Sequence, residues 1–135
     1  MPMLLEYWND ELGAKVVFDD DGKTGYAYLI VGEKVVGDVW LYNVGESPQN
    51  PEWPDRDKMP FANPAGFASE ERFEPIRDPN EIAVEWIVDS DGLSQVRVSL
   101  KGLEHALLRP GAKPGWCRLA VKPSPVAKPL NDETN

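Results

Sequence analysis

The sequence predicts a mainly β protein: one antiparallel sheet of five or six strands, strongly bent or barrel-like, with one long ordered proline-rich loop. Three observations lead to this prediction. Segments in which apolar and polar residues alternate dominate the chain, and a period of two is typical of strands. Gly and Asp bound these segments, as tight turns between antiparallel strands require. The length of 135 residues fits a single domain with its own core. A β-dominated α+β fold is the alternative.

The first elements of the chain are short. Residues 3–12, MLLEYWNDEL, fit an amphipathic helix because Leu4, Trp8 and Leu12 recur every four residues, but a strand fits them nearly as well. KVVF at 15–18 is predicted as a short strand that ends at the turn DDDGKT.

A hairpin follows at the centre of the predicted sheet. GYAYLIV at 25–31 and KVVGDVWLYN at 34–43 flank a two-residue GE turn, and Gly32 suits the first central position of type II′. That turn sets Tyr28 opposite Gly37. Both faces of the hairpin are largely apolar, so we expect it to be covered on both sides.

The segment from 45 to 79 contains no convincing strand. It is too long for a simple connection, yet five prolines within 46–64 lower the entropy lost on ordering it. We expect an ordered excursion with a helical turn at ASEERF, serving as a structural strap, a partner surface or a ligand lid. Its large apolar residues are Trp53, Met59, Phe61, Phe67 and Phe73.

The second predicted hairpin has one solvent-exposed face. EIAVEWIVD at 81–89 and LSQVRVSL at 93–100 flank a Ser-Asp-Gly loop in which Gly92 can take the left-handed conformation. This register places Glu85 opposite Arg97 as an exposed ion pair.

The remaining segments complete one domain. KGLEHALL at 101–108 is a helical turn or an irregular strand, and WCRLAVK at 116–122 is predicted as a further strand. We expect a single domain over 1–122 and an extended tail over 123–135, because PSPVAKPLNDETN is rich in proline and polar residues.

Composition limits the partners. A net charge of −9 and a pI near 4.6 argue against nucleic acid, since phosphate binding needs clustered Lys and Arg. The acidic surface serves solubility or steers a basic protein partner. One cysteine excludes an internal disulfide. The first residues, MPMLLEYWNDE, lack the features of a secretory signal, and no apolar run is long enough to span a bilayer. We therefore expect a cytoplasmic protein that does not bind membranes.

No motif in the chain predicts a catalytic residue, a metal site or a cofactor. A Cys–His pair would have to be His105 with Cys117, but no nucleophile signature surrounds them. We expect a buried structural cysteine on a strand and a partly exposed histidine. The turns DDDG and DSDG lack calcium-loop spacing, and the zinc ligand count is too low. The chain also lacks the phosphate-binding and nucleophile-elbow motifs.

Asp38 is the main ligand-binding candidate. Alternation places it on one face with Trp40 and Tyr42, where burial would raise its pKa and suit it to anchor a ligand. Alternatively, it accepts hydrogen bonds and fixes the proline-rich loop. The candidate ligand-binding residues are Asp38, Trp40, Tyr42, Tyr26 and Tyr28; the candidate partner-binding residues are Trp53 and Phe61.

Two functional hypotheses follow. The first is a non-enzymatic protein-interaction module whose acidic surface and aromatic loop bind another protein, with the acidic profile of immunity-type inhibitors of basic toxins. The second is a small β-barrel that binds or processes a small molecule in a pocket around Asp38. The predicted sheet leaves strand edges that the loop or a second copy of the chain has to cover, so a homodimer remains open.

Overall fold

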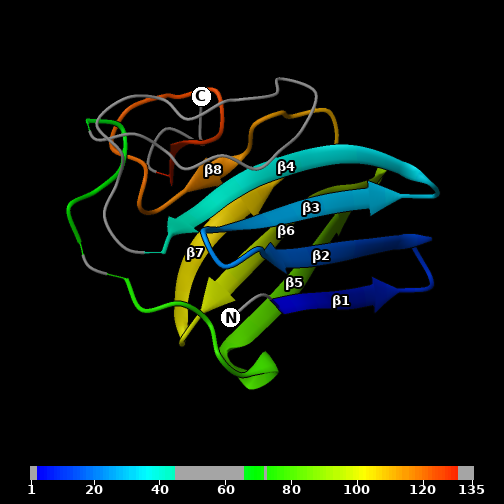
Figure 1. Cartoon of the computed structure of the whole chain (residues 1–135). Coiled ribbons are helices and arrows are strands. Elements are labelled where there is room, and N and C mark those ends of the chain that lie inside the picture. The colour runs from blue at the N-terminus through cyan, green and yellow to red at the C-terminus, as the bar shows by residue number, and fades with distance from the viewer. Residues whose placement is uncertain (1–2, 45–65, 72, 131–135) are drawn as a thin grey trace.

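The chain folds into two β-sheets that lie face to face (Figure 1). The computed structural model describes residues 3–44, 66–71 and 73–130. The first sheet has the order β1-β2-β3-β4, and the second has the order β5-β6-β7-β8-β9. Their bounds are β1 Met3–Asn9, β2 Ala14–Asp20, β3 Thr24–Val31, β4 Lys34–Asn43, β5 Ile82–Asp89, β6 Gly92–Leu100, β7 Leu103–Leu108, β8 Trp116–Cys117 and β9 Lys128–Pro129, with one 3-10 turn, η1, at Pro79–Glu81.

The mainly β prediction is confirmed, but the strands form two sheets and no closed barrel. The segments 3–12 and 101–108, for which both a helical and a strand interpretation were open, contain the strands β1 and β7. The strand expected over 116–122 is limited to the two residues of β8. Within the described residues, no helix is long and apolar enough to span a membrane.

The first hairpin has the predicted turn but not the predicted register. Gly32 has a φ of +64°, as a type II′ turn requires, and the two pairs next to the turn are as expected. A β-bulge beyond Ile30 then shifts the pairing by one residue, so Tyr28 lies opposite Asp38 and not Gly37. A second irregularity in the pairing, between Gly25 and Tyr26, reverses the sheet face to which the side chains at the end of β4 point. Each bulge reverses the face of the residues that follow it.

The second hairpin has the predicted register over most of its length. Glu85 lies opposite Arg97, and their ion pair has the expected place with 3.5 Å between nitrogen and oxygen. The turn is one residue shorter than expected, because Asp89 pairs with Gly92 and a bulge after Ile87 absorbs the difference. Gly92 has a φ of +113°, a conformation that favours glycine.

The hydrophobic core fills the space between the two sheets. Alternate residues of β2 and of the second half of β6 point inward, as the burial of successive positions shows. Antiparallel sheets stacked in this way need one apolar face each. The largest fully buried core side chains include Phe18, Leu29, Val39, Leu41, Leu100 and Leu108.

Residues from the second half of the chain cover the edge of β4 that does not pair with β3. The backbone N–H of Gly111 donates to the carbonyl of Val36 at 2.7 Å, and that of Gly115 donates to the carbonyl of Asp38 at 2.6 Å. The N–H of Trp40 donates to the carbonyl of Val126 at 2.9 Å. Val126 is fully buried, and residues 128–129 form β9 beside β8. Residues 111–129 therefore link the two sheets.

Candidate functional site

The face of the first sheet that points away from the core is the candidate site. Directly opposed residues of antiparallel strands share a face, so the strand register defines three rows of side chains across β1 to β4. We call these side chains the outer face. The rows are Leu4, Asp19, Tyr26 and Trp40; Glu6, Val17, Tyr28 and Asp38; Trp8, Lys15, Ile30 and Val35.

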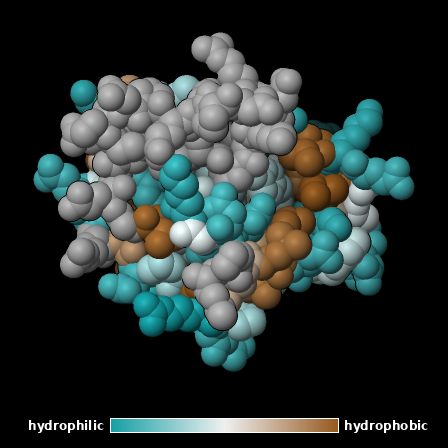
Figure 2. All heavy atoms as spheres, in the orientation of Figure 1, coloured by the Kyte–Doolittle hydropathy of each residue, from teal (hydrophilic) through white to brown (hydrophobic). Residues whose placement is uncertain are grey.

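Where the outer face is exposed to solvent, it is unusually apolar for a sheet face. Leu4 is 66% exposed, Trp8 is 61% exposed and Val35 is 42% exposed, while Val17 and Ile30 are half-buried. Figure 2, drawn from the same side as Figure 1, shows hydrophobic side chains gathered among hydrophilic ones on this face. An exposed apolar patch with a polar rim marks a binding surface.

The corresponding face of the second sheet is polar and serves as an internal comparison. Arg97 bridges Glu85 and Glu104 there, at 3.5 Å and 3.1 Å. Ser99 and Gln95 continue the same strand face. This is the usual pattern for an antiparallel sheet with one solvated side, although Ile87 and the buried Leu107 lie on the same face.

One pair of charges on the outer face is satisfied within the face. The ammonium group of Lys15 lies 2.8 Å from the Glu6 carboxylate and 4.5 Å from the centre of the Trp8 ring. The hydrogen bond from Lys15 holds the pKa of Glu6 below its usual value. These contacts align Trp8 against the sheet while leaving most of its ring exposed.

Two other carboxylates of the outer face, those of Asp19 and Asp38, have no such partner among the described residues. No donor or cation in the described part of the chain bonds to the Asp38 carboxylate, although that residue is only 9% exposed. Burial raises the pKa of Asp38, and the charge of Lys113 opposes this shift. Burial, followed by the charges of Asp21 and Asp20, also raises the pKa of Asp19. Both effects are those of charged groups that are poorly solvated.

Tyr28 lies between these two carboxylates. It is half-buried and directly opposite Asp38 on the neighbouring strand. Burial raises the pKa of its hydroxyl group, and the charges of Asp19 and Asp38 raise it further. The Tyr28 ring stacks on that of Tyr26, with 6.0 Å between ring centres.

The structure brings four of the five predicted ligand-binding residues together. Tyr26, Tyr28, Asp38 and Trp40 are on the outer face, but Tyr26 and Trp40 are fully buried. The indole N–H of Trp40 donates to the side chain of Asn43 at 2.8 Å.

Tyr42 lies on the opposite face, because the bulge at Gly25 reverses its direction. Its hydroxyl group donates to the Asp20 carboxylate at 2.6 Å and accepts from the backbone N–H of Ile76 at 3.3 Å. Its ring packs between those of Phe18 and Phe73. Tyr42 is therefore part of the core and cannot line a site with Asp38.

The candidate partner-binding residues Trp53 and Phe61 lie outside the described residues. The exposed residues Leu4 and Trp8 were not predicted from the sequence as binding residues. Their signal was present in the strand interpretation of residues 3–12, which places Leu4, Glu6 and Trp8 on one face. The half-buried Asp19 had no distinguishing sequence signal, since it belongs to an ordinary acidic turn.

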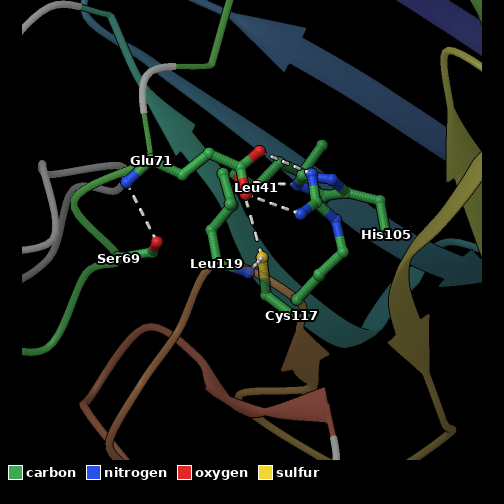
Figure 3. A network of polar contacts seen from close by, with 7 residues as sticks. Leu41, Ser69, Glu71, His105, Cys117 and Leu119 are labelled. Carbon is green, nitrogen blue, oxygen red and sulfur yellow. Dashed lines mark hydrogen bonds and ion pairs between the residues drawn. The ribbon is translucent and has the colours of Figure 1, made fainter.

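His105 and Cys117 meet at one buried carbonyl group (Figure 3). The Nε2 atom of His105 lies 2.7 Å from the carbonyl oxygen of Leu41, and the Cys117 thiol donates to the same oxygen at 3.4 Å. Burial lowers the pKa of His105 to about 4 and raises that of the Cys117 thiol to about 12. A thiol with this pKa is not activated as a nucleophile.

The cysteine is buried on a strand as expected, but the prediction of a partly exposed histidine is wrong. His105 is completely buried under the ring of Phe73, at 4.9 Å between ring centres. Beside it, Arg118 donates to both carboxylate oxygens of Glu71, at 2.8 Å and 3.0 Å. This pair fastens the segment after residue 66 to the second sheet, so the cluster has a structural role.

Within the ranges that the structure describes, no group of His, Cys, Asp and Glu residues is arranged to hold a metal ion. Comparison of the chain with protein-family models, with curated protein sequences and with solved structures found no match.

Proposed function

We propose that this protein is a non-enzymatic interaction module whose outer face docks a basic protein. The observation that carries the proposal is the exposure of Trp8 and Leu4. Side chains on a solvent-exposed face of an antiparallel sheet are normally polar. Tryptophan is among the residues that contribute most to binding energy when a partner covers them. Val35 and the half-buried Val17 and Ile30 extend the apolar surface across all four strands.

The charge of the first sheet indicates the chemistry of the partner. Acidic residues outnumber lysines over residues 3–44, and the whole chain has a net charge of −9. Asp19 and Asp38 have no compensating cation bound to them in the described part of the chain. A negative surface of this kind accelerates association with a positive partner and repels acidic proteins. An inhibitor of a basic protein, of the immunity type, fits this combination of apolar anchor and acidic rim.

We do not propose a small-molecule pocket around Asp38. Tyr42 faces the core, and Tyr26 and Trp40 are fully buried, so the aromatic residues expected to line the pocket present no common open surface.

A matched pair of isoleucine substitutions tests the proposal. Ile30 lies on the outer face and Ile87 lies on the polar face of the second sheet; both are half-buried strand residues. Immobilised wild type, Trp8→Ser, Ile30→Ser and Ile87→Ser proteins would be used to capture partners from a native lysate. The retained protein would then be purified and its affinity measured by calorimetry at several salt concentrations.

We expect wild type and Ile87→Ser to retain the same basic protein, and Trp8→Ser to weaken its binding at least about 30-fold, as for an interface hot spot. Affinity should fall as the salt concentration rises. Equal affinity of Ile30→Ser, Trp8→Ser and Ile87→Ser would show that the outer face is not the docking surface. Capture of an acidic partner would refute the charge argument.

A further inference from the structure

Asp38 is a largely buried residue whose carboxylate reaches solvent and has no hydrogen-bond or ion-pair partner among the described residues. Its residue exposure is 9%, and no described donor bonds to its side chain. The other buried acid, Asp20, is 1% exposed and accepts hydrogen bonds from the Tyr42 hydroxyl at 2.6 Å and the Gly22 N–H at 2.8 Å. Burying an unpaired charge is costly, so such groups are normally paired or ligand-bound.

The surroundings of Asp38 offer an aromatic ring and a second carboxylate. Tyr28 is directly across the strand pair, where Cβ atoms stand about 5 Å apart. Asp19 lies on β2 diagonal to Tyr28, since Val17 is the residue opposite Tyr28 and Asp19 is two positions along. Such diagonal neighbours are about 7–8 Å apart. A half-buried phenol ring therefore has a carboxylate on each of two sides.

We propose that Asp38, Tyr28 and Asp19 form a subsite for an arginine side chain of the docking partner. The inference rests on the proposed function and names the group that the outer face recognises. A guanidinium group is planar and has five donors, so it can stack on the Tyr28 ring while it bonds to the Asp38 carboxylate. A lysine ammonium group is a compact point charge that stacks less well on a ring and cannot form the bidentate pair.

Among the described residues, the cation whose charge acts on the Asp38 carboxylate is Lys113. Lys113 is exposed and influences Asp38 through its charge without forming a salt bridge. Lys15, the lysine of the outer face, is engaged with Glu6 and Trp8. An arginine from a partner would thus supply a counter-charge that no residue in the described ranges bonds to Asp38.

The test uses the intact protein with a tri-arginine peptide as probe and a tri-lysine peptide of equal charge for comparison. NMR follows the Asp38 carboxyl carbon and the Tyr28 ring while each peptide is added. Asp38→Asn removes the carboxylate that is proposed to bind the guanidinium group. Asp89→Asn is the control, since Asp89 is an exposed acid at the turn of the second hairpin. Both substitutions change the net charge equally.

We expect tri-arginine to shift the Asp38 and Tyr28 signals and to bind at least about five-fold more tightly than tri-lysine. Asp38→Asn should lose about ten-fold or more in affinity, as for a charge-assisted pair, while Asp89→Asn should stay within about two-fold of wild type. Asp38→Asn should unfold at no lower urea concentration than wild type, because the change removes an unpaired buried charge. A lost affinity would then not reflect unfolding.

Three results would overturn the subsite: equal binding of the two peptides, equal losses in Asp38→Asn and Asp89→Asn, or signal shifts confined to other residues. If these occur while Trp8→Ser still abolishes docking of the captured partner, the outer face is the docking surface and the arginine subsite is wrong. If tri-arginine binds as expected but Trp8→Ser and Ile87→Ser capture the same partner equally, the docking proposal is the one that fails.

Discussion

The buried histidine makes the stability of this protein depend on pH in a way that one substitution removes. His105 is the only histidine in the chain. Burial lowers its pKa from 6.5 to about 4, the positive charge of Arg118 acts in the same direction, and the hydrogen bond to Leu41 and the charge of Glu71 oppose the shift. The folded state therefore binds a proton less readily than the unfolded chain. Stability is full above about pH 6.5 and is lost as the pH falls towards 4.

The size of the effect follows from this shift. Each pKa unit corresponds to about 1.36 kcal/mol, so the histidine contributes a loss of about 2 kcal/mol in the free energy of unfolding between pH 7 and pH 5. His105→Gln keeps an amide nitrogen that can donate to the carbonyl oxygen of Leu41, but it does not titrate. The variant should therefore lose about 2 kcal/mol less than wild type over the same interval.

Urea denaturation followed by tryptophan fluorescence measures both free energies at pH 7, 6 and 5 at constant ionic strength. Taking the difference between the two proteins cancels contributions from groups that both contain, including Glu71 and Arg118. Identical pH dependence of wild type and His105→Gln would refute the reasoning. So would an NMR titration that gives His105 in the folded protein a pKa near the ordinary value.

Three further predictions concern the core and its packing. Tyr42→Phe removes the hydroxyl group that donates to the buried Asp20 at 2.6 Å, and should lower the free energy of unfolding by about 1–3 kcal/mol in urea denaturation; an unchanged midpoint would contradict this. Burial raises the pKa of the Cys117 thiol to about 12, so a disulfide reagent should modify it only at the rate of unfolding, and rapid modification of the native protein would disagree. In Gly115→Ala the added Cβ meets the carbonyl oxygen of Leu107, and we expect the same assay to show a loss of about 2 kcal/mol, whereas a neutral substitution would mean that the backbone relaxes.

Alternation along the chain was sufficient to predict most strands, because each strand of a two-layer structure has one buried face. It also gave the register of the second hairpin, where Glu85 and Arg97 identify the wet side. The register of the first hairpin could not be found in this way. Both faces of β4 are apolar, so a one-residue bulge leaves the apolar pattern intact and changes only which residue faces which side.

The division of the strands into two sheets depends on contacts between residues distant in sequence. The pairing of Ala68 with Ala120 and the bond between Trp40 and Val126 have no local signal. The part of the candidate site on β1 was missed for a simpler reason: a spacing of four residues in Leu4 and Trp8 fits a helix turn and a strand face equally well. Only the structure decides between them, and with that choice the exposed face of β1 is defined.

The backbone hydrogen bonds that cover the edge of β4 also affect the order in which the protein can fold during synthesis. The ribosome makes the four strands of the first sheet well before it makes Gly111, Gly115 and Val126, which later bond to β4. Until then the nascent sheet exposes a pairing edge with apolar residues on both sides, a state that favours association between chains. Productive folding of this protein therefore depends on delaying, or shielding, the first sheet until the last quarter of the chain arrives.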